Sequence, residues 1–310
     1  MGPGVKPRDD SRVCINGGIS WMASVKLSAY RSEQAKAWGF LLPALLWTSA
    51  FFLAPLVIMA LYSLWQRVGS KLVTSVSLAN YESFFAKSFL LESLVNSIEV
   101  TVVVTLVSLL LAYPLAWILA ERVPRRWQRL ALILAILPFW TSYVVRSYSW
   151  LLVLSEGGIL SNFLLDSGLT AEPVSFANNR GATVVGFVHF FVMLLTLTIY
   201  ANLVQLSPSY RKAAADLGAG PIRTFWHVTL PLTLPGIMVG AFLTFVLCIG
   251  DYITPQILGG NQELLLPQAI MLQIARRSDF PMASAMAMIL MAVVSLVYLA
   301  CARWLKIDRV

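Results

Sequence analysis

Six long apolar segments constrain what this chain can fold into. They cover residues 38–64, 94–120, 130–154, 183–206, 234–258 and 282–302. Each is at least as long as the roughly 20 residues that an α-helix needs to cross a hydrocarbon core. Because lipid offers no partner to exposed backbone N–H and C=O groups, segments of this length are expected to be helical. The sequence therefore predicts an all-α integral membrane protein with six transmembrane helices.

The composition agrees with this class and excludes others. Hydrophobic residues make up 58% of the chain and charged residues 12%, whereas a soluble domain has about half and about a quarter. The net charge of +8 does not indicate nucleic-acid binding, because excess Lys and Arg in a membrane protein gather in its cytoplasmic loops. The three cysteines lie far apart with no CxxC pair, and so no disulfide framework and no metal site are expected.

The charges of the loops predict the orientation. The loop at 121–129 has four arginines against one glutamate, and residues 207–233 have three basic side chains against one acidic one. The loop at 155–182 has three acidic side chains against one arginine. Since positively charged loops stay in the cytoplasm, the first two are assigned to that side. With six crossings, both termini are then expected in the cytoplasm as well.

Residues 207–233 form a polar, basic interruption between two apolar segments. Ala214 and Gly218 lie four residues apart, so on a helix they would share a face with few side chains, to which another surface can come close. The Gly-Pro step at 220–221 is expected to end this helix and to begin a second, short one. The aromatic pair at 225–226 adds apolar area at the membrane surface. A docking surface and an interfacial segment anchored by tryptophan both explain these features.

The sequence lacks the common catalytic motifs. It contains no GxxxxGK[ST] phosphate loop, no HExxH and no GxSxG. The chain is therefore not expected to be an enzyme or to need a cofactor. If its work is driven by ATP, a separate subunit must hydrolyse the nucleotide.

The interruption resembles the "EAA" loop of binding-protein-dependent ABC importer permeases. That pattern is Glu-Ala-Ala, three residues, Gly, nine residues and Ile-x-Leu-Pro. The matching residues here are Ala213, Ala214, Gly218, Val228 in the isoleucine position, Leu230 and Pro231, and Lys212 stands where the family usually has glutamate. The resemblance covers most of the chain from about Trp38 onwards. Residues 138–143 with Arg146, and residues 250–252 leading to 258–260, resemble the spermidine/putrescine branch of these permeases.

This resemblance implies a type I ABC importer permease in a bacterial inner membrane. Such a permease forms half of a translocation pathway, together with a second, homologous permease. The resemblance also implies ABC ATPase subunits that receive a coupling helix near residues 213–218, and a periplasmic binding protein that delivers the solute. The solute is expected to be a polyamine such as spermidine or putrescine. The alternatives are opines, amino-acid derivatives or another small solute.

The same resemblance divides the chain into four parts. Residues 1–37 are expected to form a cytoplasmic tail without fixed structure, of which the first 21 residues are disordered or not translated. Residues 38–93 are the first transmembrane helix and a periplasmic linker. Residues 94–303 are a five-helix transport core that includes the coupling loop 207–233. Residues 304–310 are a second cytoplasmic tail.

Arg146 and Asp251 are the charges within the apolar segments that matter most. A charge at mid-bilayer costs at least about 2.5 kcal/mol and usually faces the interior of the helix bundle or a water-filled path. One hypothesis is an Arg146–Asp251 ion pair that joins the third segment to the fifth. Another is that Asp251 lines the path and attracts a cationic amine, with Arg146 as its partner or as a gate. The third hypothesis is that these charges simply lie near the outer membrane interface.

Aromatic residues gather near Arg146 in the sequence. Trp140 and Tyr143 are candidates for the path, and with Tyr148 and Trp150 they could hold an ammonium group by cation–π attraction. An aromatic belt at the membrane interface explains these residues as well. His189, isolated on an apolar segment, is expected to be a hydrogen-bonded packing residue.

Two other classes of protein are weighed against the importer. A secondary transporter driven by an ion gradient would show an inverted repeat with broken helices in both halves, and no convincing repeat is found. A membrane anchor without a pore would have no use for Arg146 and Asp251.

Overall fold

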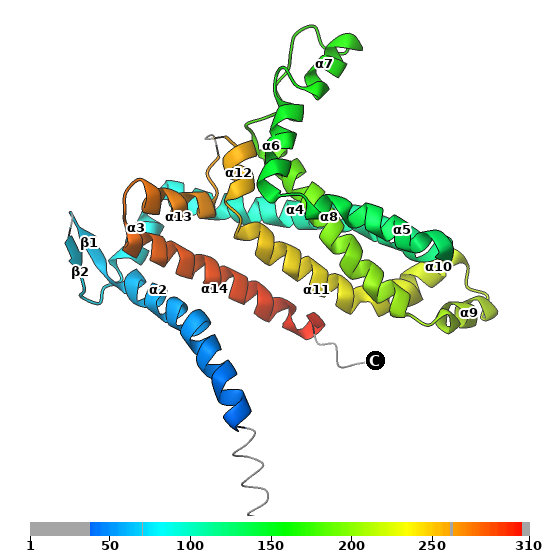
Figure 1. Ribbon diagram of the computed structural model, residues 1–310, viewed down its shortest axis with the longest axis horizontal. Coiled ribbons are helices and arrows are strands. Elements are labelled where there is room, and N and C mark those ends of the chain that lie inside the picture. Colours follow the sequence, from blue (N-terminus) through cyan, green and yellow to red (C-terminus); the bar gives the residue numbers. More distant parts are fainter. Residues whose placement is uncertain (1–37, 70, 261–262, 306–310) are drawn as a thin grey trace, which may run out of the picture. The chain divides into compact units, whose positions relative to one another are not determined.

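A computed structural model describes residues 38–69, 71–260 and 263–305. Figure 1 shows that this part of the chain is almost entirely helical. Helical stretches long and apolar enough to cross a membrane number six among the described residues: Trp38–Leu64, Ser88–Glu121, Tyr143–Asp166, Arg180–Gln205, Pro221–Ile249 and Phe280–Ala302. The predicted all-α membrane fold with six spans is confirmed. The expectations for residues 1–37 fall outside the described part of the chain.

The chain divides after Met59 into two compact units. The first is helical from Trp38 and contains one turn of π-helix, η1 (Ser49–Leu53), before α2 (Ala54–Leu64) begins. The N–H of Ala54 bonds to the carbonyl of Ser49, five residues back. This turn directly precedes Pro55, which has no N–H to donate to the carbonyl four residues before it.

The second unit opens with the linker to the transport core. A hairpin of β1 (Gln66–Val68) and β2 (Lys71–Val73) pairs antiparallel, with Gln66 opposite Val73. The short helix α3 (Ala79–Ala86) follows, and its Phe84 is fully buried. Phe84 packs with residues of α4 (Ser88–Glu121), α13 (Leu266–Ala275) and α14 (Phe280–Leu305), and so the linker is fixed to this unit.

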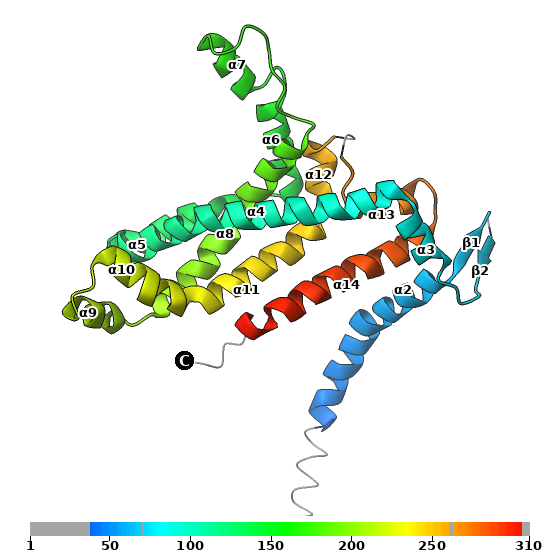
Figure 2. The ribbon, with the colours of Figure 1, turned by 180° about the vertical axis from the view of Figure 1, so that it is seen from behind.

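Three helices make the centre of the second unit: α4, α8 (Arg180–Gln205) and α11 (Leu230–Ile249). Figure 2 shows α8 and α11 side by side behind α4. Buried apolar side chains fill the space between them in two clusters, one around Phe187 and Phe191 and one around Leu195 and Ile199. A Cβ atom added to Gly240 of α11 would lie 3.0 Å from Leu195 of α8, and so this glycine lets the two backbones come close.

The third apolar segment was expected as one helix over 130–154, and that prediction is wrong. The chain forms α5 (Arg125–Ile136), a 3₁₀ turn η2 (Leu137–Trp140), and then α6 (Tyr143–Leu154), which leads to α7 (Ile159–Asp166). Thr141 and Ser142 separate the helices in extended conformation, with ψ angles of 146° and 135°. Pro138 contributes to the break because it cannot continue the hydrogen-bond ladder of α5.

The fifth segment also differs from the predicted 234–258. It begins earlier, as α10 (Pro221–Thr224) and the π turn η3 (Phe225–Thr229), and continues into α11. It ends at Ile249, where residues 250–252 interrupt it before the short helix α12 (Ile253–Leu258). The end of the 207–233 loop and the fifth span thus share one helix.

Replacing Gly186 tests how closely α8 and α12 must pack. A Cβ atom on Gly186 would lie 2.4 Å from Leu258 Cδ1 and 3.1 Å from Thr254 Cγ2. Gly186→Ala is therefore expected to lower the free energy of unfolding by about 1–3 kcal/mol through overpacking. Thermal unfolding of the purified chain in detergent measures this. Gly157→Ala is the control, since its Cβ would meet nothing within 4 Å; equal melting temperatures for the two variants would contradict the prediction.

Candidate functional site

Asp251 lies in the interruption between α11 and α12, where it caps the shorter helix. Its Oδ1 accepts a hydrogen bond from the N–H of Ile253 at 2.8 Å, and its Oδ2 accepts one from the N–H of Thr254 at 3.4 Å. The first N–H groups of a helix have no partner within the helix, and a carboxylate there also interacts favourably with the helix dipole. Asp251 is half-buried.

Tyr143 connects this cap to the third segment. Its hydroxyl donates to Asp251 Oδ2 and accepts from the hydroxyl of Thr254, whose side chain is fully buried. Tyr143 is the first residue of α6, and its ring packs edge-on against Phe190 of α8. One phenol therefore ties together the start of α6, the start of α12 and the face of α8.

Arg146 supports the interruption of the third segment. It is only 7% exposed, and its Nη2 donates to the carbonyls of Pro138 and Thr141 at 2.8 and 2.9 Å. The guanidinium lies 5.2 Å from the centre of the Phe190 ring, a cation–π contact. The carbonyls released by the helix break thus find a charged donor one turn further along, where lipid would offer none.

Arg146 and Asp251 do not form a direct ion pair among the described residues. Arg146 bonds to backbone carbonyls before α6, while Asp251 accepts from Tyr143 and from N–H groups of α12. The hypothesis of a pairing contact is therefore replaced by an indirect connection. Tyr143 bonds to Asp251, and both Tyr143 and Arg146 pack on the ring of Phe190.

The four aromatic residues of this region divide into two kinds. Trp140 is 80% exposed and Tyr148 is 53% exposed, whereas Tyr143 and Trp150 both contact α8. The indole Nε1 of Trp150 donates to Nδ1 of His189 at 2.8 Å, which confirms His189 as a hydrogen-bonded packing residue. Among the described residues these four rings form no stacked or edge-on pair with one another.

The predicted coupling loop, residues 207–233, begins with α9 (Pro208–Asp216). The side chain of Ser207 accepts from the N–H of Ser209 at its start. At its end, Gly218 has a φ of +79°, the N–H of Gly218 bonds to the carbonyl of Ala215, and the N–H of Ala219 bonds to that of Ala214. This is the Schellman arrangement, in which glycine takes the left-handed conformation. The helix therefore ends earlier than the expected Gly-Pro step, and Gly218 terminates it instead of adding to its small-residue face.

The turn between α9 and α10 exposes apolar side chains. Leu217 is 88% exposed and Ile222 is 75% exposed, and Lys212 and Ala213 of α9 also face outward. Ala214 is the buried residue of α9.

An ion pair fixes α9 to the rest of the unit. Arg211 pairs with Glu121, the last residue of α4. The exposed residues of α9 are thus presented from a helix that is held in place at its inner face.

Pro221 begins a helix as predicted, but this helix is not short. Val228 lies in η3, and Leu230 and Pro231 are already in α11, so the end of the EAA-like pattern falls inside the fifth span. The N–H of Leu230 bonds to the carbonyl of Phe225, five residues back. As at η1, a π turn directly precedes a proline that cannot donate.

Thr254 and Glu121 are site residues that the sequence reasoning missed. Thr254 follows Asp251 by three residues, the spacing at which a capping side chain meets the N–H groups of a new helix, and this signal was available. Glu121 gave no such signal, because its partner Arg211 is distant in sequence. Among the described residues, no group of three or more His, Cys, Asp and Glu side chains is placed to hold a metal ion.

Replacing Arg146 tests its role at the helix break. Arg146→Met leaves two carbonyls without their charged donor, and we expect it to lower the free energy of unfolding by about 3 kcal/mol. Arg146→Lys is expected to lie between this variant and the parent, since a lysine keeps the charge but not the planar fork. Thermal unfolding in detergent measures the relative stability of the parent chain and the two variants. The control is Arg126→Met on the exposed start of α5; if it destabilises the chain as much as Arg146→Met, the assigned role is wrong.

Known proteins share both the sequence and the fold. Residues 112–306 match the family model described as "binding-protein-dependent transport system inner membrane component". The chain is 30% identical to the spermidine/putrescine transport system permease protein PotB of Haemophilus influenzae, over 81% of this chain and 89% of that protein. PotB of Escherichia coli is 31% identical over 60% of this chain and 68% of that protein.

A solved structure is similar in fold. A permease chain of a bacterial ABC transporter that imports the acidic polysaccharide alginate superposes with a TM-score of 0.72 at 15% identity, covering 92% of this chain and 100% of that chain. Six apolar spans, an EAA-like loop between the fourth and the fifth, and the match of residues 112–306 lead to one conclusion. The chain belongs to the binding-protein-dependent transport system inner membrane components, the permease family of ABC importers.

Proposed function

We propose that this permease forms half of the translocation pathway of an importer for a polyamine such as spermidine or putrescine. The identity of 30% over 81% of the chain to a spermidine/putrescine permease is the observation that carries the proposal. The chain supplies the pathway, and a separate ATPase supplies the energy.

The chemistry around Asp251 suits an amine cargo. A half-buried carboxylate in the break of a membrane-spanning helix can accept hydrogen bonds from an ammonium group and interacts with its charge at low effective dielectric. The hydroxyl of Tyr143 donates a hydrogen bond to one of the Asp251 oxygens. An arriving ammonium group would replace or share this donor, while the exposed indole of Trp140 adds a face for cation–π contact.

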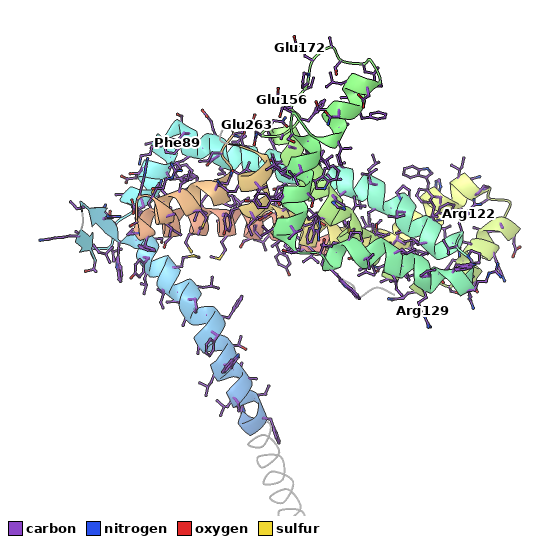
Figure 3. All side chains as sticks on the ribbon, turned by 45° about the horizontal axis from the view of Figure 1, so that its top comes forward. Phe89, Arg122, Arg129, Glu156, Glu172 and Glu263 are labelled. Carbon is purple, nitrogen blue, oxygen red and sulfur yellow. The ribbon has the colours of Figure 1, made fainter. Side chains whose placement is uncertain are left out.

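Charge supports an orientation with both termini in the cytoplasm of a bacterial cell. Figure 3 shows Arg122 and Arg129 well apart from Glu156, Glu172 and Glu263. Because positively charged loops remain in the cytoplasm, the end with Arg122 is the cytoplasmic one. The break at Asp251 then lies toward the periplasmic side, where a binding protein would deliver the cargo.

The coupling loop suits contact with an ATPase subunit. Leu217 and Ile222 expose apolar side chains at a turn held by the Arg211–Glu121 pair. In the proposed importer, closure of the ATPase pair moves this turn in each of two homologous permeases. The two cores then change between outward-open and inward-open states, as a shift between two arrangements.

The coupling role predicts different outcomes for two glycines of one loop. Gly218→Val places a β-branched residue at a φ of +79°, whereas Gly220 has a φ of −68° and room for a methyl group. With partner subunits co-expressed, Gly218→Val is expected to lower solute-stimulated ATP hydrolysis about tenfold or more by misplacing the docking turn. Gly220→Ala should retain it. Equal activity of both variants, at equal amounts of assembled complex, would refute the coupling role.

The substrate role of Asp251 predicts a loss of amine uptake. Asp251→Asn keeps an oxygen that can cap α12 but removes the charge, and we expect spermidine uptake into cells to fall about tenfold, which corresponds to about 1.4 kcal/mol. The control is Asp166→Asn at the exposed end of α7. Unchanged uptake together with a less stable complex would assign Asp251 to structure alone.

A further inference from the structure

An apolar groove runs between α4 and the helix formed by α10, η3 and α11, and it continues over the surface of α10 and η3 alone. It consists of three adjoining cavities of about 610, 380 and 560 Å³. The first two share Tyr113, Pro114, Phe225 and Trp226, and Trp226 also lines the third.

The dimensions of the groove match one leaflet of a bilayer. Along α4 it extends from Leu106 to Trp117, a rise of about 16 Å at about 1.5 Å per residue. Half of a hydrocarbon core is about 15 Å thick. Along α4, the polar groups of the wall are the hydroxyl of Tyr113, which bonds to Thr233 of α11 at 3.3 Å, and the indole N–H groups of Trp117 and Trp226. Such a wall suits an acyl chain, which needs no hydrogen bond.

The polar end of the groove is positively charged. The guanidinium of Arg122 lies 5.2 Å from the ring of Trp117, and Arg223 and His227 line the last cavity. Neither arginine takes part in an ion pair within the described residues. Glu121, the acid next to Arg122 in the sequence, is paired with Arg211, and Asp216, the acid nearest to Arg223 in the sequence, forms no ion pair with it. Two cations at this end of the groove are therefore available to an anionic group.

We propose that this groove is a binding site for an anionic phospholipid of the cytoplasmic leaflet. One acyl chain lies between α4 and α11, and the headgroup phosphate bonds to Arg122 and Arg223. Apolar pockets with basic rims between transmembrane helices recognise such headgroups. The leaflet assignment rests on the orientation given under the proposed function. The bound lipid would cover Phe225 and Trp226 beside the coupling loop, and so its charge would steady the start of the fifth span.

Native mass spectrometry of the full chain tests the site. The protein is purified in detergent, delipidated, and titrated with dioleoylphosphatidylglycerol or with dioleoylphosphatidylcholine. We expect the anionic lipid to bind at least about fivefold more tightly. Arg122→Gln and Arg223→Gln should each weaken its binding about fivefold, because each removes one cation near the phosphate. Arg129→Gln, in the same basic segment but outside the groove, should leave binding unchanged.

Filling the groove gives a second, independent variant. Val107→Trp puts a bulky side chain into the cavity of about 610 Å³, whereas Leu115→Trp places the same side chain at an exposed position of α4 that does not line the groove. Only Val107→Trp should release the lipid, with both variants equally folded by circular dichroism.

Each of the following results would overturn the proposed lipid site. Equal binding of the two lipids, or equal weakening by Arg129→Gln and Arg122→Gln, excludes the site. If Val107→Trp instead prevents copurification of a second permease and leaves lipid binding intact, a protein occupies the groove. None of these measurements uses the ATPase or the solute. The lipid site can therefore be refuted while the importer assignment stands, and the importer assignment can be refuted while the lipid site stands.

Discussion

The rest of the structure depends on how backbone groups are satisfied where transmembrane helices break. An unbroken helix bonds all of its interior N–H and C=O groups, and lipid cannot replace a lost bond. This chain breaks two segments, before α6 and before α12. At the first break Arg146 donates to the released carbonyls, and at the second Asp251 accepts from the released N–H groups. Each charge has the sign that its break requires, which explains both residues without an ion pair.

The two breaks are joined by a single side chain. Tyr143 begins the helix after the first break and bonds to the carboxylate in the second. A change at Asp251, such as the arrival of an ammonium group, therefore alters a contact of α6 as well as of α12. In the proposed importer, binding of the solute at Asp251 would therefore influence how the third and fifth segments are arranged.

Length and hydropathy made the six spans predictable from the sequence, because a run of more than 20 apolar residues has few alternatives. The loop spacing made the family predictable. The breaks were not predictable to the same degree. Pro138 was visible, but the partner of Arg146 is the backbone, which carries no sequence signal. The small size of Gly218 predicts a helix face with few side chains, whereas the structure uses its positive φ to end α9. Leu230-Pro231 was interpreted as the end of a loop, although η3 lets the helix pass through it.

That last difference bears on how the two ends of the permease communicate. The helix from Pro221 to Ile249 has 29 residues, a length of about 43 Å at about 1.5 Å per residue. It begins in the coupling loop and ends at the break that holds Asp251. In the proposed importer, a displacement of residues 217–222 would therefore reach the break at Asp251 along one helix. Pro231 and Pro235 each remove a hydrogen bond near the start of α11, next to the π turn η3, and so a bend in this helix costs least in that region.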